Sequence, residues 1–329
     1  MSDPPSRDCP GWPGQLSFLH DIAHGARGGW SPRNVLLGFI GAFPVYCLGR
    51  LLEASAESAL VWVVGGIGTL IVAVVVAFAL AMIAGAAGWE YARGCHFTLG
   101  ESLALVRSRA GNLLCSVFFL PCAVALFALI ITAGAWLFGL LANFLAVIWL
   151  VVVGLPLSLF SAGLILLGAP ALLLMLPASV LDCREAFDTV SRAMSYVRSR
   201  PLRFACGLLA ATAGAIASAA VFTVFVTIVY GLLVGTYLCA VDTVDHRCIG
   251  EVLKQALEGF APLWPLASVD TPTGVSGWLH AVVGRLISAS FVAALMSSTA
   301  RLYLLLRWEI DQDPPASLMK VRETFAWAE

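Results

Sequence analysis

The chain alternates between long apolar runs and short polar segments. Charged residues are absent from residues 34–49, 58–89, 110–181, 204–241 and 286–300. A helix needs about 20 apolar residues to cross a hydrocarbon core of about 30 Å. The pattern therefore predicts six membrane spans, at about residues 35–53, 59–86, 112–137, 143–178, 203–232 and 281–306.

The fourth of these spans is too long for one straight helix. Pro156 and Pro170 lie inside it, and a proline removes a backbone hydrogen bond and bends or breaks a helix. The sequence leaves open whether this span is kinked, broken or re-entrant. The predicted fold is an all-α polytopic helical membrane protein with about six transmembrane helices and two interfacial amphipathic helices.

Lysine and arginine favour one orientation of these spans, because cytoplasmic loops of membrane proteins carry an excess of both. Most of them fall in segments that the six spans place on one side, and only Arg50, Arg247, Lys254 and Arg285 fall on the other. We therefore expect an integral protein of a membrane, the bacterial inner (cytoplasmic) membrane, with both termini in the cytoplasm. The expected parts are a cytoplasmic N-terminal arm (1–34), a transmembrane domain (35–308) with an outer cap (242–280), and a cytoplasmic tail (309–329).

Composition supports a membrane protein and excludes several other classes. Of the 329 residues, 60% are hydrophobic and 12% are charged, whereas a soluble domain has about 45–50% apolar and about 25% charged residues. The 19 basic and 20 acidic residues balance, so we expect no nucleic acid among the partners. The nine cysteines form no CxxC pair, which argues against zinc. A bond between Cys239 and Cys248 stays open.

Val-Arg-Ser-Arg occurs twice, at residues 106–109 and 197–200. An amphipathic stretch precedes each copy, and each stretch opens with residues typical of a capping box, Thr98–Glu101 and Asp182–Glu185. We interpret this internal repeat as two helices on the inner membrane surface. Their arginines either only set the topology or dock anionic lipid or a partner protein. The candidate docking residues are Arg107, Arg109, Arg192, Arg198 and Arg200.

Three stretches carry a resemblance to a known group. They are FTLGESLALVRSRAGNLL, GAPALLLMLPASVLDCREAFDTVSRAMSYVRSRPLRF and STARLYLLLRWEIDQDPP. Together they resemble bacterial multi-span membrane proteins of unknown function that are similar to the membrane domain of some glycerophosphodiester phosphodiesterases. The resemblance spans about residues 95–329. It implies a helical membrane fold and no activity, since the catalytic residues of those enzymes belong to a separate soluble domain.

The last predicted span carries a polar stripe with a charge. Its candidate site consists of Ser297, Ser298 and Arg301. An ionisable residue inside a span is a functional-site hypothesis, here for a substrate or a lipid headgroup. The alternative is that Arg301 extends its guanidinium to the membrane surface.

Other motifs are weaker. His20 and His24 are four residues apart, as in zinc proteases, but the required glutamate after the first histidine is Asp21. We interpret them as part of a polar turn that ends at Gly25. The DTVDHRC sequence at 242–248 and the GVSG sequence at 274–277 are interpreted as loops. No catalytic residue, metal site or cofactor is predicted.

These features favour a non-enzymatic scaffold or assembly factor that docks a partner or anionic lipid at the inner face. The alternative function is a transporter or a lipid-handling membrane protein. Expected partners are membrane lipids and either a protein partner or a second copy of the chain. The small residues Gly231 and Gly235 form a GxxxG pair, which permits close helix packing within one chain or between copies.

Overall fold

The computed structural model describes residues 15–54, 60–93, 96–182, 185–240 and 275–312. All secondary structure within these ranges is helical. The elements are α1 (Gln15–Gly25), η1 (Ala26–Trp30), α2 (Pro32–Ala54), α3 (Leu60–Arg93), α4 (Leu99–Ser108), α5 (Ala110–Leu141), α6 (Asn143–Trp149), η2 (Leu150–Gly154), α7 (Leu155–Leu181), α8 (Ala186–Ser199), α9 (Pro201–Ala240) and α11 (Val275–Asp311). The predicted all-α polytopic class is confirmed.

Five helical segments are long and apolar enough to cross a membrane. They are Gly65–Ala92, Ala110–Leu141, Asn143–Leu181, Pro201–Val226 and Val282–Asp311, and each coincides with a predicted span. The predicted first span coincides with α2, which has 23 residues and is not one of these five. A total of six spans therefore stays a prediction. The predicted outer cap lies almost entirely outside the described residues.

The long fourth span is helical along its whole length. A π-helical turn, η2, joins α6 to α7 directly before Pro156. A π turn widens the helix by one residue and thereby accommodates a residue that has no backbone N–H. The hydroxyl of Ser158 donates to the carbonyl of Gly154 at 2.6 Å. Pro170 lies inside α7, which continues past it.

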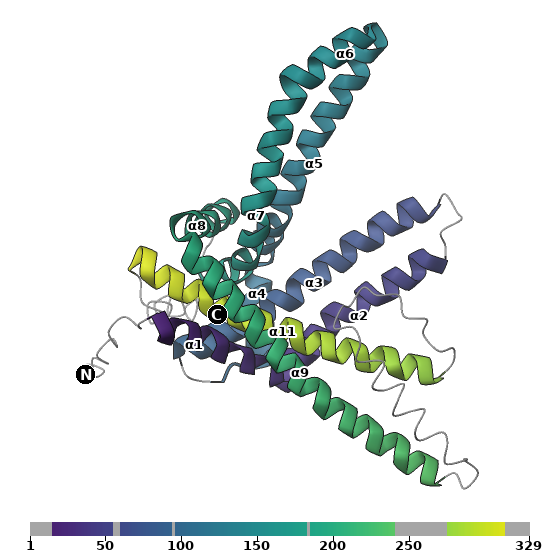
Figure 1. Cartoon of the computed structure of the whole chain (residues 1–329), viewed down its shortest axis with the longest axis vertical. Coiled ribbons are helices and arrows are strands. Elements are labelled where there is room, and N and C mark those ends of the chain that lie inside the picture. The colour runs from purple at the N-terminus through teal and green to yellow at the C-terminus, as the bar shows by residue number, and fades with distance from the viewer. Residues whose placement is uncertain (1–14, 55–59, 94–95, 183–184, 241–274, 313–329) are drawn as a thin grey trace.

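The helices meet at one end of the molecule in a region that we call the base. The base comprises residues 15–37, 79–93, 96–113, 171–182, 185–215 and 289–311. It holds two large clusters of buried apolar side chains, contributed by α1, α2, α3, α4, α5, α7, α8, α9 and α11. Figure 1 shows the long helices leaving this region in different directions. Helix α11 is central, since it contacts α1, α2, α3, α7, α8 and α9.

Residues 121–167, which we call the outer hairpin, extend away from the base (Figure 1). Gly154 is the one buried residue in this range. The two helices of the hairpin pack on each other, through Phe127 against Phe160 at 5.6 Å and Phe138 against Trp149 at 5.1 Å between ring centroids. Their outward side chains are apolar and exposed, so we expect lipid to surround them.

The N-terminal segment packs on the bundle from residue 15 onward. Phe18, Ile22 and Ala26 recur every four residues and are buried, which gives α1 and η1 one apolar face against α9 and α11. Contact with α11 is close: a Cβ atom added to Gly29 would lie 2.6 Å from the Cβ of Ala294. The interpretation of His20 and His24 as part of a polar turn is wrong, because both lie in α1. This helix ends at Gly25, and η1 continues the chain.

The two amphipathic helices that carry the Val-Arg-Ser-Arg copies are present as α4 and α8. The first predicted capping box is confirmed, because Thr98 accepts from the backbone N–H of Glu101 while Glu101 accepts from that of Thr98. The second is wrong: α8 begins after Glu185, which makes no side-chain cap. Asp182 instead ends α7, and its carboxylate binds side chains of other helices.

Candidate functional site

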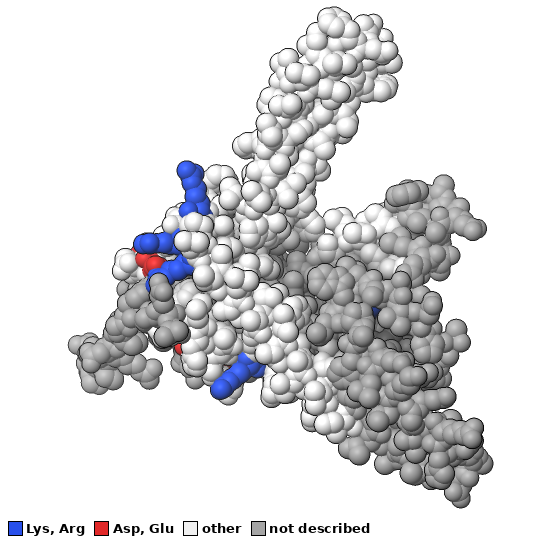
Figure 2. Space-filling model, in the orientation of Figure 1, with Lys and Arg blue, Asp and Glu red and all other residues white. Residues whose placement is uncertain are grey.

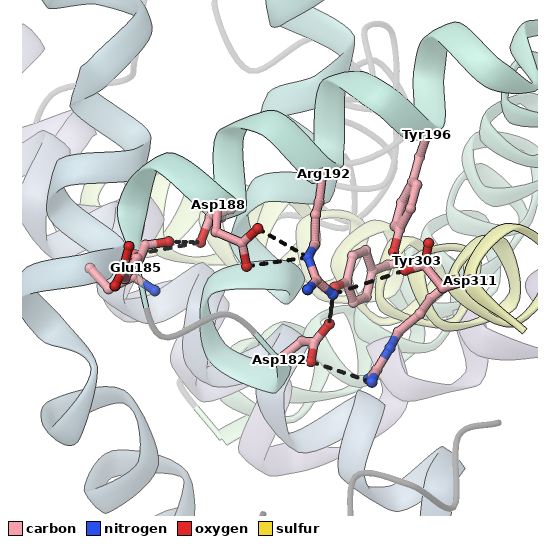
Figure 3. Close-up of polar contacts among 10 residues, drawn as sticks. Asp182, Glu185, Asp188, Arg192, Tyr196, Tyr303 and Asp311 are labelled. Carbon is pink, nitrogen blue, oxygen red and sulfur yellow. Dashed lines mark hydrogen bonds and ion pairs between the residues drawn. The ribbon is translucent and has the colours of Figure 1, made fainter. Parts of the chain in front are cut away.

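The carboxylate of Asp182 joins three helices in the base (Figure 3). It accepts from Arg192 of α8 at 3.1 Å and from the hydroxyl of Tyr303 of α11 at 3.2 Å. Its other oxygen lies 3.4 Å from the guanidinium of Arg307, also on α11. The side chains of Asp182 and Arg307 are only 12% and 7% exposed, so this ion pair is largely removed from water.

Arg192 extends the same network along α8. Its guanidinium pairs with Asp188 one turn earlier, at 3.2 Å, and lies 3.9 Å from Asp311 near the end of α11. The hydroxyl of Tyr196 donates to Asp311 (Figure 3). Burial, and next this hydrogen bond, raise the pKa of Tyr196 well above its ordinary value of 10.0. Tyr196 is therefore a permanent hydrogen-bond donor that ties α8 to α11.

Glu309 forms a second ionic contact, between α11 and the start of α9. Its carboxylate pairs with Arg203, and Arg200 lies 3.7 Å away. The guanidinium of Arg203 also lies over the ring of Phe18, 5.4 Å from its centroid. Cation–π contacts of this kind add to the ion pair, so the N-terminal helix is attached to the same network.

A third ionic contact attaches α2 to α3. Arg33 pairs with Glu90 at 3.0 Å and donates to the carbonyl of Phe97. The backbone N–H of Phe97 donates to Glu90 at 3.1 Å. The segment between α3 and α4 is thus held by both partners of one ion pair.

The predicted polar site on the last span is brought together with the N-terminal segment. Arg301 donates to the carbonyl of Asp21 at 3.2 Å, lies 3.3 Å from Nδ1 of His24, and lies over the ring of Tyr91 at 5.0 Å. Ser297 and Ser298 are buried beneath α1 and η1. Helix α1 and η1 together therefore cover all three predicted residues.

His24 is perturbed by this contact. Burial lowers the pKa of His24 below its ordinary value of 6.5, and the charges of Arg27 and Arg301 lower it further. A neutral imidazole beside Arg301 is consistent with Nδ1 accepting a hydrogen bond from the guanidinium.

The five predicted docking arginines fall into two groups. Arg192 and Arg200 contribute to the ionic network, and Arg109 is buried where α4 meets α5. Arg107 and Arg198 are exposed. Figure 2 shows charged side chains gathered at the base, while the hairpin surface carries none.

Sequence analysis missed the acidic and aromatic residues of the network and one of its arginines. The missed residues are Asp182, Tyr196, Tyr303, Arg307, Glu309 and Asp311. One signal was present. Asp182 is the first charge after a run of 72 uncharged residues (110–181), and a charge at that position requires a partner at the end of another span.

The weaker motifs give no assembled site. His20 has an exposed side chain, and its ring centroid lies 6.1 Å from that of His24. In the described ranges, no group of three or more His, Cys, Asp or Glu side chains is arranged to hold a metal ion. DTVDHRC and Cys248 lie outside those ranges, as does Gly274 of the GVSG motif.

Comparison of the chain with protein families, with curated proteins and with solved structures found no match. Membrane character therefore follows from the apolar helices themselves. The features that bear on function are the charged and polar contacts of the base.

Proposed function

We propose that this integral membrane protein is a non-enzymatic scaffold or assembly factor that docks a partner or anionic lipid at its inner face. One observation carries the proposal. Arg107 and Arg198, which hold the same position in the two Val-Arg-Ser-Arg copies, are both exposed on helices that the base holds in place.

The ionic network supports a rigid docking surface. Helix α8 is attached through Arg192 to Asp182 at the end of α7 and to Asp311 of α11, so its exposed face has a fixed orientation. Breaking a buried ion pair is costly, because the remaining charge stays buried without its partner. A surface mounted in this way loses little conformational freedom when a partner binds.

The alternative function is transport or lipid handling. The divergence of the long helices favours it, since their apolar side faces are open to lipid chains (Figure 1). Against it, Arg301 is covered by α1 and bonded to Asp21 and His24. A binding site for a transported anion needs that guanidinium to face a cavity.

Native mass spectrometry of the full chain, extracted with its own lipids, tests the proposal. We expect a protein or lipid partner that stays with the wild type and with Arg27→Gln, and that is lost from the double variant Arg107→Gln/Arg198→Gln. Arg27 is a matched control, because it is another exposed arginine in the base. A chain that retains one defined small molecule in all three forms, and no other partner, supports transport instead.

The resemblance to the membrane domain of glycerophosphodiester phosphodiesterases is compatible with this proposal. In such proteins the membrane domain accompanies a separate catalytic domain, and a scaffold role for the present chain requires no catalytic residue of its own.

A further inference from the structure

The first three residues of the two Val-Arg-Ser-Arg copies share one pattern of burial and exposure. Val106 and Val197 are buried, and the arginine that follows each of them is exposed. Ser108 and Ser199 are exposed as well. Each copy stands at the end of an amphipathic helix, immediately before a candidate membrane span begins at Ala110 or Pro201.

The guanidinium groups of Arg107 and Arg198 have no ion pair or hydrogen bond to any residue that the structure describes. The fourth residue of each copy differs in this respect, since Arg109 is buried and Arg200 lies 3.7 Å from Glu309. One positive charge in each copy is therefore available for a ligand.

Large apolar side chains are exposed beside both arginines. Leu103, one turn before Arg107, is 49% exposed. It lines an open hollow on α4 together with Gly100, Ala104, Arg107 and Ser108. Leu202, four residues after Arg198, is 82% exposed. A water-facing surface rarely combines unpaired arginines with exposed leucines at helical spacing, whereas the membrane interface favours that combination.

Each arginine also precedes the exposed stripe of the span that follows. The stripe of α5 contains Gly111, Cys115, Phe119, Cys122 and Leu126, and that of α9 contains Leu202, Cys206, Leu209, Ala213 and Ile216. The first residue of each stripe comes four residues after the arginine. Because the stripes face lipid chains, the arginines lie near the level of the headgroups.

The geometry points to a pair of matched sites at which Arg107 and Arg198 bind the phosphates of anionic lipids. This inference rests on the proposed docking surface and specifies its occupant. The guanidinium supplies two parallel donors to a phosphate, and Leu103 and Leu202 contact the acyl chains next to it.

A soluble protein partner fits these residues less well. The two arginines belong to different helices, each at the start of its own span, and the exposed leucines beside them lead into apolar stripes. Lipid reaches both places independently, whereas one soluble protein would have to cover both and compete with the bilayer for Leu103 and Leu202.

The test uses the full chain in nanodiscs made of equal parts of phosphatidylglycerol and phosphatidylcholine. Native mass spectrometry measures the lipids that stay bound, at low and at high salt. Each site contains one arginine, and one arginine near an anionic surface changes binding about fivefold, so Arg107→Gln/Arg198→Gln is expected to lower the preference for phosphatidylglycerol about fivefold at each of the two sites. Arg107→Lys/Arg198→Lys should retain most of it, and Arg27→Gln should leave it unchanged.

The same spectra separate failure of this inference from failure of the proposed function. Loss of phosphatidylglycerol from the Gln variant alone, with a salt dependence in the wild type, supports lipid sites. If the Gln variant keeps its lipid and instead loses a protein partner added from the native membrane, the docking surface stands and the lipid assignment is overturned. If neither lipid nor protein binding changes, both are overturned.

Discussion

The base and the outer hairpin both contain helices that are long and apolar enough to cross a membrane, but the side chains of these helices are buried to very different extents. In the most apolar stretch of α11, 78% of residues are buried inside the protein. The corresponding shares are 11% for α5 and 6% for the α6–α7 span. Nearly all charged contacts in the described ranges lie in the base, whereas residues 110–181 contain no charge.

This difference separates two tasks that helices perform in a membrane. In the base, packing and ion pairs fix the ends of several helices relative to one another. In the outer hairpin, two helices pack only on each other, and we expect lipid chains to cover their outward apolar faces. The 32 residues of α5 span about 48 Å, more than the hydrocarbon thickness of about 30 Å, and such a mismatch is relieved by tilting.

Removing the charge of Asp182 is expected to have the largest effect on stability. Asp182→Asn removes the carboxylate charge that pairs with buried Arg307 and weakens the contact to Arg192. A broken buried pair costs about 3–5 kcal/mol. Titration with sodium dodecyl sulfate, followed by tryptophan fluorescence, measures the change in unfolding free energy.

Asp188→Asn is the matched control for that variant, because Asp188 pairs with the same arginine but is 46% exposed. An exposed pair contributes about 0–1 kcal/mol. Equal losses from both variants would show that the network acts through net charge and not through burial.

Two leucines of the same helix compare the base with the outer hairpin directly. Leu181 is fully buried and Leu166 is 77% exposed. Leu181→Ala is expected to cost about 2–5 kcal/mol in the same titration. Leu166→Ala should stay within about 0.5 kcal/mol. A large loss from Leu166→Ala would mean that a second copy or a partner covers the hairpin.

The contact of η1 with α11 is expected to tolerate no added methyl group. The Cβ atom in Gly29→Ala would lie 2.6 Å from that of Ala294 and 2.8 Å from the carbonyl oxygen of Ser290. Overpacking of this kind costs about 1–3 kcal/mol. Gly66→Ala on α3 meets no atom within 4 Å and should be neutral or slightly stabilising. Protease cleavage near the N-terminus reports whether α1 has detached.

The sequence predicted most of the helices because a bilayer imposes a simple requirement on composition. Uncharged runs located the five apolar helices, and the Thr98–Glu101 cap followed from two residues that interact locally. The packing of α1 on the bundle was not predicted, although Phe18, Ile22 and Ala26 have the spacing of one apolar helix face. Those apolar residues stand among charged neighbours such as Asp21 and Arg27, and this composition suggested a solvated arm.

The ionic network could not be predicted from local patterns. Asp182 and Glu185 have the spacing of a capping box, but three partners distant in sequence, Arg192, Tyr303 and Arg307, bind the Asp182 carboxylate. Their combined attraction exceeds the contribution of a helix cap, which is about 1 kcal/mol. The docking arginines show the same limit, since the last arginine of the motif is buried in one copy, as Arg109, and exposed beside Glu309 in the other, as Arg200.

The smallest expected effect concerns the attachment of α1 to the base at low pH. Because the pKa of His24 in the folded protein lies below 6.5, the unfolded chain binds more protons there as the pH falls. The contribution of neutral His24 is therefore present above about pH 6.5 and is lost below it. Protonation would place a positive charge among Arg27, Arg301 and His20, and the charge of Asp21 would offset it in part. Hydrogen exchange of α1 should thus accelerate between about pH 7.5 and about pH 5.5, after correction for the intrinsic exchange rate.

His24→Gln should remove most of this acceleration, because glutamine still accepts from Arg301 and does not titrate. An equal acceleration in His24→Gln would assign the effect to another group.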